Sequence, residues 1–261
     1  MDGGILFNMK KILILDIQAN YKLEGDTPKE MKMQADVILT VAESKRLIAQ
    51  GVAALLSVQK ATQDGLVVIP TGTTNLNARG LFPEQMADIV LRNGEIAPEL
   101  DRYSGVRQFK PGDVFIKGAN ALNYQQQVAG ITVGAGDGGT IGGVIGKIIA
   151  GRATLVIPVG LEKLVAHDIQ ASYHKYASGD ATLTLMCALW PVTGTIITEI
   201  EAIQQLVPGV EALHVGSGGI LRAEGSVRLL YVGDADSIDQ AISLIQTIQG
   251  EPHFLPIRSR E

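Results

Sequence analysis

The sequence predicts an α/β protein: a mostly parallel sheet covered by helices on both faces, followed by a smaller α+β unit. Three observations predict this class. Apolar runs of strand length alternate with segments of helical periodicity up to about residue 180. Some of these runs, such as LVVIP at 66–70, are apolar throughout, as expected of strands buried on both faces. Glycine supplies 30 of the 261 residues, and glycine-rich loops follow the predicted strands.

The composition narrows the class of protein. A hydrophobic content of 46% is enough for a full core, and a net charge of −5 without a Lys/Arg cluster indicates no nucleic-acid surface. A single cysteine, Cys187, excludes an intramolecular disulfide, and the histidines have no metal-ligand spacing. No apolar run reaches about 18 residues, and the N-terminal stretch lacks the pattern of a signal peptide. We therefore expect a cytoplasmic protein without a membrane span.

The first elements are predicted from apolar runs and a helix cap. Residues 11–17 and 35–39 are apolar runs, and the first of them is a candidate strand. Thr40 and Glu43 fit a capping box, in which the threonine accepts from a backbone N–H and the glutamate reaches back. The spacing predicts a helix that continues to residue 62.

A threonine-rich loop follows the buried strand at 66–70. Its hydroxyl, amide and glycine backbone groups can all donate to phosphate or carboxylate oxygens. The alternative is a threonine-rich helix cap. The candidate ligand-binding residues here are Thr71, Gly72, Thr73, Thr74 and Asn75. A helix is then predicted in FPEQMADIVLRNGE, residues 82–95.

A second candidate loop follows the strand predicted at 113–116. Lys117, Gly118 and Asn120 come directly after this strand, in a loop that we extend to Asn123. Open α/β sheets place their ligands at the carboxyl ends of strands, so these residues are candidates for binding. The alternative is an asparagine-rich turn without a ligand.

A glycine loop lies at the centre of the chain. The sequence predicts a strand at 131–134, a loop at 136–143 and a helix at 144–150. Glycines between a strand and a helix N-terminus leave backbone N–H groups open to an anion, and the helix dipole favours negative charge there. The alternative is a tight turn. The candidate ligand-binding residues are Gly136, Gly138, Gly139 and Thr140.

A further apolar strand, at 153–159, leads to Glu162 and Lys163. If all four loops follow strands of one parallel sheet, they emerge at one edge and form one crevice. Lys117, Glu162 and Lys163 are then the candidate catalytic groups. Residues 173–180 are predicted to be a linker, because they are polar and contain Gly179.

After the linker the pattern changes to β-α-β-β-α-β, the order of a ferredoxin-like unit. Strands are predicted at 182–190, 210–215, 225–232 and 253–257. Thr198 with Glu201 forms one predicted capping box, and Ser237 is predicted to begin the second helix. We therefore predict two domains, 1–180 and 181–261.

The helix and loops from Val41 to Asp168 resemble a known superfamily. The resemblance rests on SKRLIAQGVAALL, DGLVVIPTGTTN, DVFIKGANALN and the final βαβ ending in PVGLEK. They resemble the superfamily of ribose-5-phosphate isomerase, glucosamine-6-phosphate deaminase, the coenzyme A transferases and the sugar-phosphate-sensing domains of DeoR-type repressors. This resemblance implies a three-layer α/β/α domain in which the loop at 71–75 holds a phosphate. The segment after residue 181 resembles a small regulatory module.

The chain departs from the isomerases at one informative place. Where they carry Asp-Gly-Ala-Asp, this chain has Lys117-Gly118-Ala119-Asn120, so both catalytic carboxylates are replaced. We therefore expect a sensor or ligand-binding protein for a small phosphorylated metabolite, a sugar phosphate or a nucleotide. Two alternatives stay open: an enzyme like the isomerases or the coenzyme A transferases, and a dinucleotide-binding protein through Gly134-x-Gly136-x-x-Gly139. Expected partners are the anionic metabolite and further copies of the chain in a homo-oligomer. The sequence identifies no cofactor.

Overall fold

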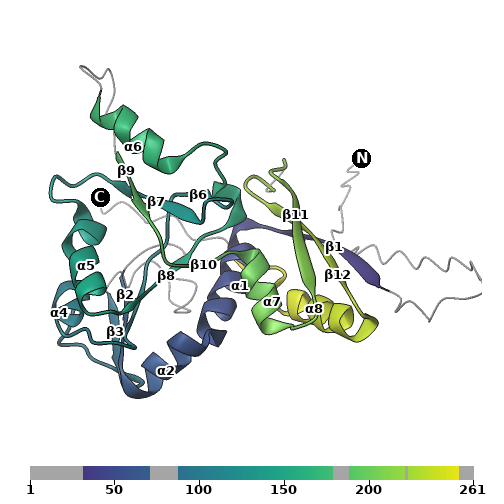
Figure 1. Cartoon of the computed structure of the whole chain (residues 1–261). Coiled ribbons are helices and arrows are strands. Elements are labelled where there is room, and N and C mark those ends of the chain that lie inside the picture. Colours follow the sequence, from purple (N-terminus) through teal and green to yellow (C-terminus); the bar gives the residue numbers. More distant parts are fainter. Residues whose placement is uncertain (1–31, 71–87, 179–187, 221–222, 253–261) are drawn as a thin grey trace, which may run out of the picture.

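The computed structural model describes residues 32–70, 88–178, 188–220 and 223–252 of the chain. Its strands form three sheets, and helices pack around them (Figure 1). Several predicted features lie outside the described residues. They are the strand at 11–17, the loop Thr71–Asn75, Cys187 and the strand at 253–257.

The largest sheet has six strands in the order β10, β8, β5, β2, β3, β4. The first four strands run parallel to one another, β3 pairs antiparallel with β2, and β4 pairs antiparallel with β3. This sheet confirms an α/β protein and the strands predicted at 66–70, 113–116 and 153–159. In sheet order the strands are β10 (Thr195–Ile197), β8 (Thr154–Pro158), β5 (Val114–Ile116), β2 (Leu66–Ile69), β3 (Ile89–Arg92) and β4 (Glu95–Ile96).

The helix predicted at 82–95 is wrong where the structure describes it. Residues 89–96 form the hairpin of β3 and β4, joined at Asn93 and Gly94. Both joining residues have positive φ, 49° and 85°. Asn-Gly is the strongest short-range signal for a two-residue hairpin turn, and it outweighs the helical composition of the residues before it.

Helices cover both faces of the large sheet. Alternate strand residues point to opposite faces. Val67 and Val114 belong to a core shared with α1 (Val41–Ala54) and α2 (Leu56–Asp64). On the other face Val68 and Phe115 pack in a core shared with α4 (Arg102–Val106) and α5 (Gly139–Ala150).

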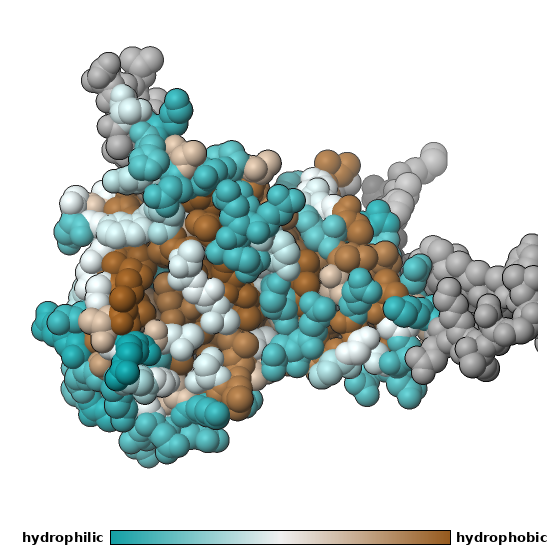
Figure 2. All heavy atoms as spheres, in the orientation of Figure 1, coloured by the Kyte–Doolittle hydropathy of each residue, from teal (hydrophilic) through white to brown (hydrophobic). Residues whose placement is uncertain are grey.

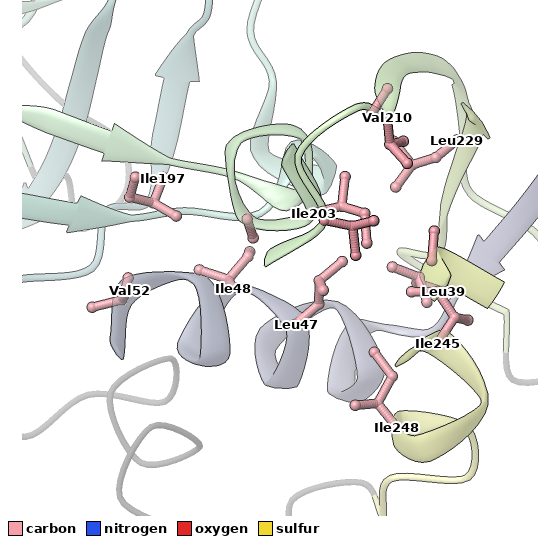
Figure 3. Close-up of a cluster of buried hydrophobic side chains, with 14 of the residues drawn as sticks. Leu39, Leu47, Ile48, Val52, Ile197, Ile203, Val210, Leu229, Ile245 and Ile248 are labelled. Atoms are coloured by element: carbon pink, nitrogen blue, oxygen red, sulfur yellow. The ribbon is translucent and has the colours of Figure 1, made fainter. Parts of the chain in front are cut away.

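Helix α1 lies in the middle of the first core. The predicted capping box is confirmed: Thr40 N donates to Glu43 Oε2 at 2.8 Å, and Glu43 N donates to Thr40 Oγ1 at 3.4 Å. The predicted helix is interrupted at Leu55, whose backbone is extended, and α2 follows. In Figure 3 the side chains of α1 point toward those of β10, α7, β12 and α8. The labelled core residues are Leu39, Leu47, Ile48, Val52, Ile197, Ile203, Val210, Leu229, Ile245 and Ile248.

A second, small sheet contains the strand that leads into the glycine loop. Its order is β6 (Ala121–Asn123), β7 (Val128–Val133) and β9 (Ala188–Val192), all antiparallel. Helix α6 (Ile169–Ala177) packs against β9, so the linker predicted at 173–180 is wrong over its first residues. Asp168 caps α6 by accepting from Gln170 N and Ala171 N.

The third sheet joins distant parts of the sequence. Its order is β1 (Met33–Leu39), β12 (Val227–Gly233) and β11 (Glu211–Ser217), also antiparallel. Helices α7 (Glu199–Leu206) and α8 (Ala235–Ile248) pack against it. Helix α8 begins after Asp234, three residues before the predicted cap at Ser237.

The strand pairing corrects the predicted unit at 181–261. β9 pairs with β7 and β10 pairs with β8, so neither belongs to the sheet of β11 and β12. The second neighbour of β12 in this sheet is β1, which comes from the N-terminal part of the chain. A pattern of apolar residues predicts a strand but not its partner, and for this reason the sequence placed the boundary at residue 181.

Hydrophobic side chains also appear on the surface. In the space-filling view a group of them lies over the end of the molecule formed by β11 and β12 (Figure 2). Leu213, Val215 and Ile220 in this part of the chain are 43%, 51% and 77% exposed. The outer face of the sheet formed by β1, β12 and β11 is therefore partly apolar.

Candidate functional site

Charged residues gather at the carboxyl ends of the parallel strands. Lys117 follows β5 directly. The 3₁₀ helix η1 (Leu161–Lys163) follows β8 and carries Glu162 and Lys163, and Glu199 follows β10 as the first residue of α7. The structure thus brings together the three candidate catalytic residues of the sequence, with α1 adding a lysine that sequence reasoning missed.

We call Lys45, Lys117 and Lys163 the lysine cluster. Lys45, on α1, is only 9% exposed, and Lys117 and Lys163 are partly buried. Burial and the charge of Lys163 lower the pKa of Lys45, while Glu162 raises it. Burial lowers the pKa of Lys117, and the charges of Arg102 and Lys163 lower it further. Like charges held close together and away from water favour an anion between them.

Backbone carbonyl groups hold two of the ammonium groups in place. Lys117 Nζ donates to Gly118 O at 3.1 Å, and Lys163 Nζ donates to Ala119 O at 2.9 Å. Both acceptors belong to the loop that the sequence predicted as a ligand site. An ammonium group has three donors, so one carbonyl contact orients it and leaves donors for a ligand.

Glu162 places a carboxylate beside the lysines. Its Oε2 is buried and has no hydrogen-bond partner among the described residues. The carboxylate lies over Gly160, where an added Cβ would come within 1.8 Å of Oε2. A buried carboxylate oxygen without a partner is unusual, and such groups gather at functional sites.

Glu199 lies beneath the cluster and is fully buried. Its Oε2 accepts from Leu161 N at 2.9 Å, and its Oε1 accepts from the Ser44 hydroxyl. Burial raises the pKa of Glu199 to about 7, against the opposing effect of these hydrogen bonds, and the charge of Glu162 adds to the rise. One carboxyl group therefore ties α7 to both η1 and α1.

The Tyr231 hydroxyl, on β12, is a second buried polar group near Glu199. It has no hydrogen-bond partner among the described residues, and burial and the charge of Glu199 raise its pKa. Sequence reasoning missed Ser44, Glu199 and Tyr231. The only local signal was the capping box of Thr198 and Glu201, which is confirmed and places Glu199 directly after a strand end.

Arg102 connects the cluster to the glycine loop. Its Nε and Nη2 donate to the two oxygens of Asp88 at 2.7 and 2.5 Å, in a bidentate pair. Its Nη1 donates to Thr140 Oγ1 at 2.5 Å, on the first turn of α5. Because the charge of Arg102 also acts on Lys117, the first turn of α5 lies near the lysine cluster.

The sequence predicted that the glycine loop follows a strand of the parallel sheet, and this prediction is wrong. It follows β7 of the antiparallel sheet, so β7, α5 and β8 do not form the parallel βαβ unit that a dinucleotide-binding motif needs. Gly138 and Gly139 have positive φ, 84° and 57°. Asp137 Oδ1 accepts from Gly139 N at 2.9 Å, so a carboxylate of the chain already occupies one backbone donor of the loop.

Of the other predicted residues, Asn120 and Gly118 contact groups of the chain itself, and Gly136 is open. Asn120 Oδ1 accepts from Thr132 N at 2.9 Å and joins its loop to β7. Gly118 supplies the carbonyl that Lys117 contacts. An added Cβ at Gly136 would meet no atom within 4 Å, so this glycine is not required by packing. This contact of Asn120 fits the asparagine-rich turn, and its predicted contact with a ligand stays a prediction.

Comparison with known proteins gives no family for the chain. No protein-family model, no curated protein and no solved structure matches it. Within the described residues no group of three or more His, Cys, Asp or Glu side chains can hold a metal ion. Among the helices described, none is both long and apolar enough to cross a membrane. The chemistry of the lysine cluster therefore carries the functional argument.

Proposed function

We propose that the chain binds a small phosphorylated metabolite, such as a sugar phosphate, at the lysine cluster, as a sensor or ligand-binding protein. One observation carries this proposal: Lys45, Lys117 and Lys163 converge where the parallel strands end, and the charge of Lys163 lowers the pKa of the other two. A dianion would relieve that repulsion and accept from the ammonium groups of Lys117 and Lys163. The carboxyl edge of a parallel sheet is also where α/β proteins bind ligands.

The resemblance to the sugar-phosphate isomerase and deaminase superfamily supports the same proposal. In that superfamily the loop corresponding to Thr71–Asn75 holds the phosphate. Here this loop follows β2, the strand beside β5 in the sheet, and Lys117 follows β5. The threonine loop and the lysine cluster would then share one ligand.

We infer that the third sheet is the counterpart of the superfamily's small module. We infer a ferredoxin-like unit whose first strand is β1, because β1, β12 and β11 have the order that strands one, three and two have in that fold. Helices α1 and α8 follow β1 and β12 and share one core with the sheet. The large domain would then be an insertion within this unit.

Titration with ribose 5-phosphate and glucose 6-phosphate in a calorimeter tests the proposal, with the unphosphorylated sugars as ligand controls. A hydrogen bond to a charged group contributes about 1.5–3 kcal/mol, so Lys117→Ala and Lys163→Ala should each weaken binding about tenfold or more. Lys147→Ala, an exposed lysine on α5, removes the same charge away from the cluster and should change affinity little. Equal affinity of all three variants, or no preference for the phosphorylated sugars, would contradict the proposal.

A second candidate function is catalysis with Glu162. The observation that favours it is the buried Oε2 without a described partner, next to a lysine whose pKa is lowered. Coenzyme A transferases of the resembled superfamily use a glutamate nucleophile. Glu162→Gln distinguishes the two functions: an enzyme loses turnover of acyl-coenzyme A or sugar phosphate, whereas a binding protein keeps its affinity for the anion.

A further inference from the structure

We propose that a cavity beside the glycine loop binds an uncharged, planar, nitrogen-containing aromatic ring, such as a nucleobase. The cavity has a volume of about 600 Å³ and lies between the end of β7, the loop at 135–138, α6 and β9. Ligand pockets usually measure about 300–1,000 Å³, so a nucleoside fits. This site is separate from the lysine cluster and does not depend on its proposed function.

Aromatic and apolar side chains form most of the cavity wall. Trp190 and Leu189 come from β9, Tyr173 from α6 and Val133 from β7. Aromatic rings prefer to stack or meet edge to face with other rings, and such pairs contribute about 0.5–1.5 kcal/mol beyond the burial of area. The wall therefore favours a flat ring over an aliphatic or strongly hydrated group.

Glycines fix the position of the indole ring. An added Cβ at Gly138 would lie 2.9 Å from Trp190 Cζ3, and one at Gly142 would lie 3.5 Å from the same atom. The first distance is too short for a Cβ and the second is an ordinary van der Waals contact, so the ring can lie this close to the loop because residue 138 is a glycine. The glycine loop thus lies against the aromatic wall, and the anion contact that the sequence predicted there stays a prediction.

The polar groups of the cavity indicate an uncharged ligand with N–H donors. No lysine or arginine is among the described residues that line it, whereas Asp137 contributes a carboxylate and Gln170 a side-chain amide. Asp137 Oδ1 accepts from Gly139 N, and its second oxygen can accept from an exocyclic amine of a base. A phosphate inside the cavity would be repelled by Asp137.

The sequence offers a direct probe, because Trp190 is its single tryptophan. Adenosine, which has no phosphate, is titrated into the full chain while tryptophan emission is recorded, with cytidine and nicotinamide as further rings. We expect saturable quenching by at least one of them. Absence of saturable quenching by all three would overturn the proposal.

Three variants show whether the quenching comes from this cavity. Asp137→Asn keeps an oxygen for Gly139 N, and it should weaken binding of the amine-bearing ring about tenfold, since a hydrogen bond to a charged group is lost. Gln170→Ala should weaken it several-fold, whereas Gln59→Ala, an exposed glutamine on α2, should not. Lys117→Ala should leave adenosine binding unchanged. Equal affinities of Asp137→Asn, Gln170→Ala and the unmodified chain would overturn the assignment, whatever the result for sugar phosphates.

Discussion

The lysine cluster and the Trp190 cavity are built differently, and none of the three lysines lines the cavity. The cluster lies at the carboxyl ends of parallel strands, and its lysines come from three separate segments of the sequence. The cavity lies beside an antiparallel sheet, and apolar and aromatic side chains form most of its wall. Charged side chains lie at the carboxyl edge of the parallel sheet, whereas the antiparallel sheet forms a wall that suits an aromatic ring.

The difference shows why a glycine loop alone does not define a phosphate site. In the parallel sheet the loops after β5 and β8 carry lysines whose ammonium groups are held by carbonyls. In the glycine loop Asp137 takes a backbone donor, and Gly138 makes room for Trp190. Glycines there allow close packing, which is a different reason for the same sequence pattern.

The largest expected effect concerns Glu199, beneath the cluster. Its pKa is raised from 4.5 to about 7 in the folded chain. Below 4.5 the group is protonated in both states, so its full contribution is present. Between 4.5 and about 7 the unfolded chain loses the proton first, and stability falls as pH rises, by about 3 kcal/mol in total. Above that window the loss is complete.

Glu199→Gln should remove this pH dependence, because glutamine is neutral at every pH and keeps an oxygen for Leu161 N. Relative to the unmodified chain, the variant should gain stability as pH rises through the window. Urea unfolding at a series of pH values measures this difference. Glu211→Gln makes the same substitution at the exposed end of β11 and is the matched control. If the difference in the free energy of unfolding between Glu199→Gln and the unmodified chain stays constant across the window, the buried carboxyl group is ionised there in the folded chain as well.

A glycine series tests the packing of the cavity side. Gly138→Ala combines a positive φ with contacts at 2.9 Å to Gly142 Cα and Trp190, so it should lower the free energy of unfolding by about 2 kcal/mol. Gly139→Ala has positive φ but its nearest contact is 3.8 Å away, and about 1 kcal/mol is expected. Gly136→Ala should change little. Only Gly138→Ala should also shift tryptophan emission, and equal losses for all three would reject the packing account.

The features that could be predicted from the sequence are those that depend on residues close together in the chain. Both threonine capping boxes were found because their partners are three residues apart. Lys117 and Lys163 were placed by the rule for strand ends. Ser44 and Glu199 are 155 residues apart, and no local pattern joins them. Lys45 is charged and stands on a helix, so its burial follows only from tertiary packing. The Asn93-Gly94 turn could have been recognised from the sequence.

The smallest expected effect is on the titration of the lysines, and it tests whether the cluster acts as one unit. Lys163→Met removes a like charge while keeping a side chain of similar length, so the pKa of Lys117 and of Lys45 should both rise. The pH dependence of reductive methylation at each lysine measures these changes, with Lys147 of α5 as an internal reference. Both rises should shrink in concentrated salt, because salt screens the charge of Lys163. If Lys117 rises while Lys45 does not, the cluster is not one site, and an anion at Lys117 would then be held without α1.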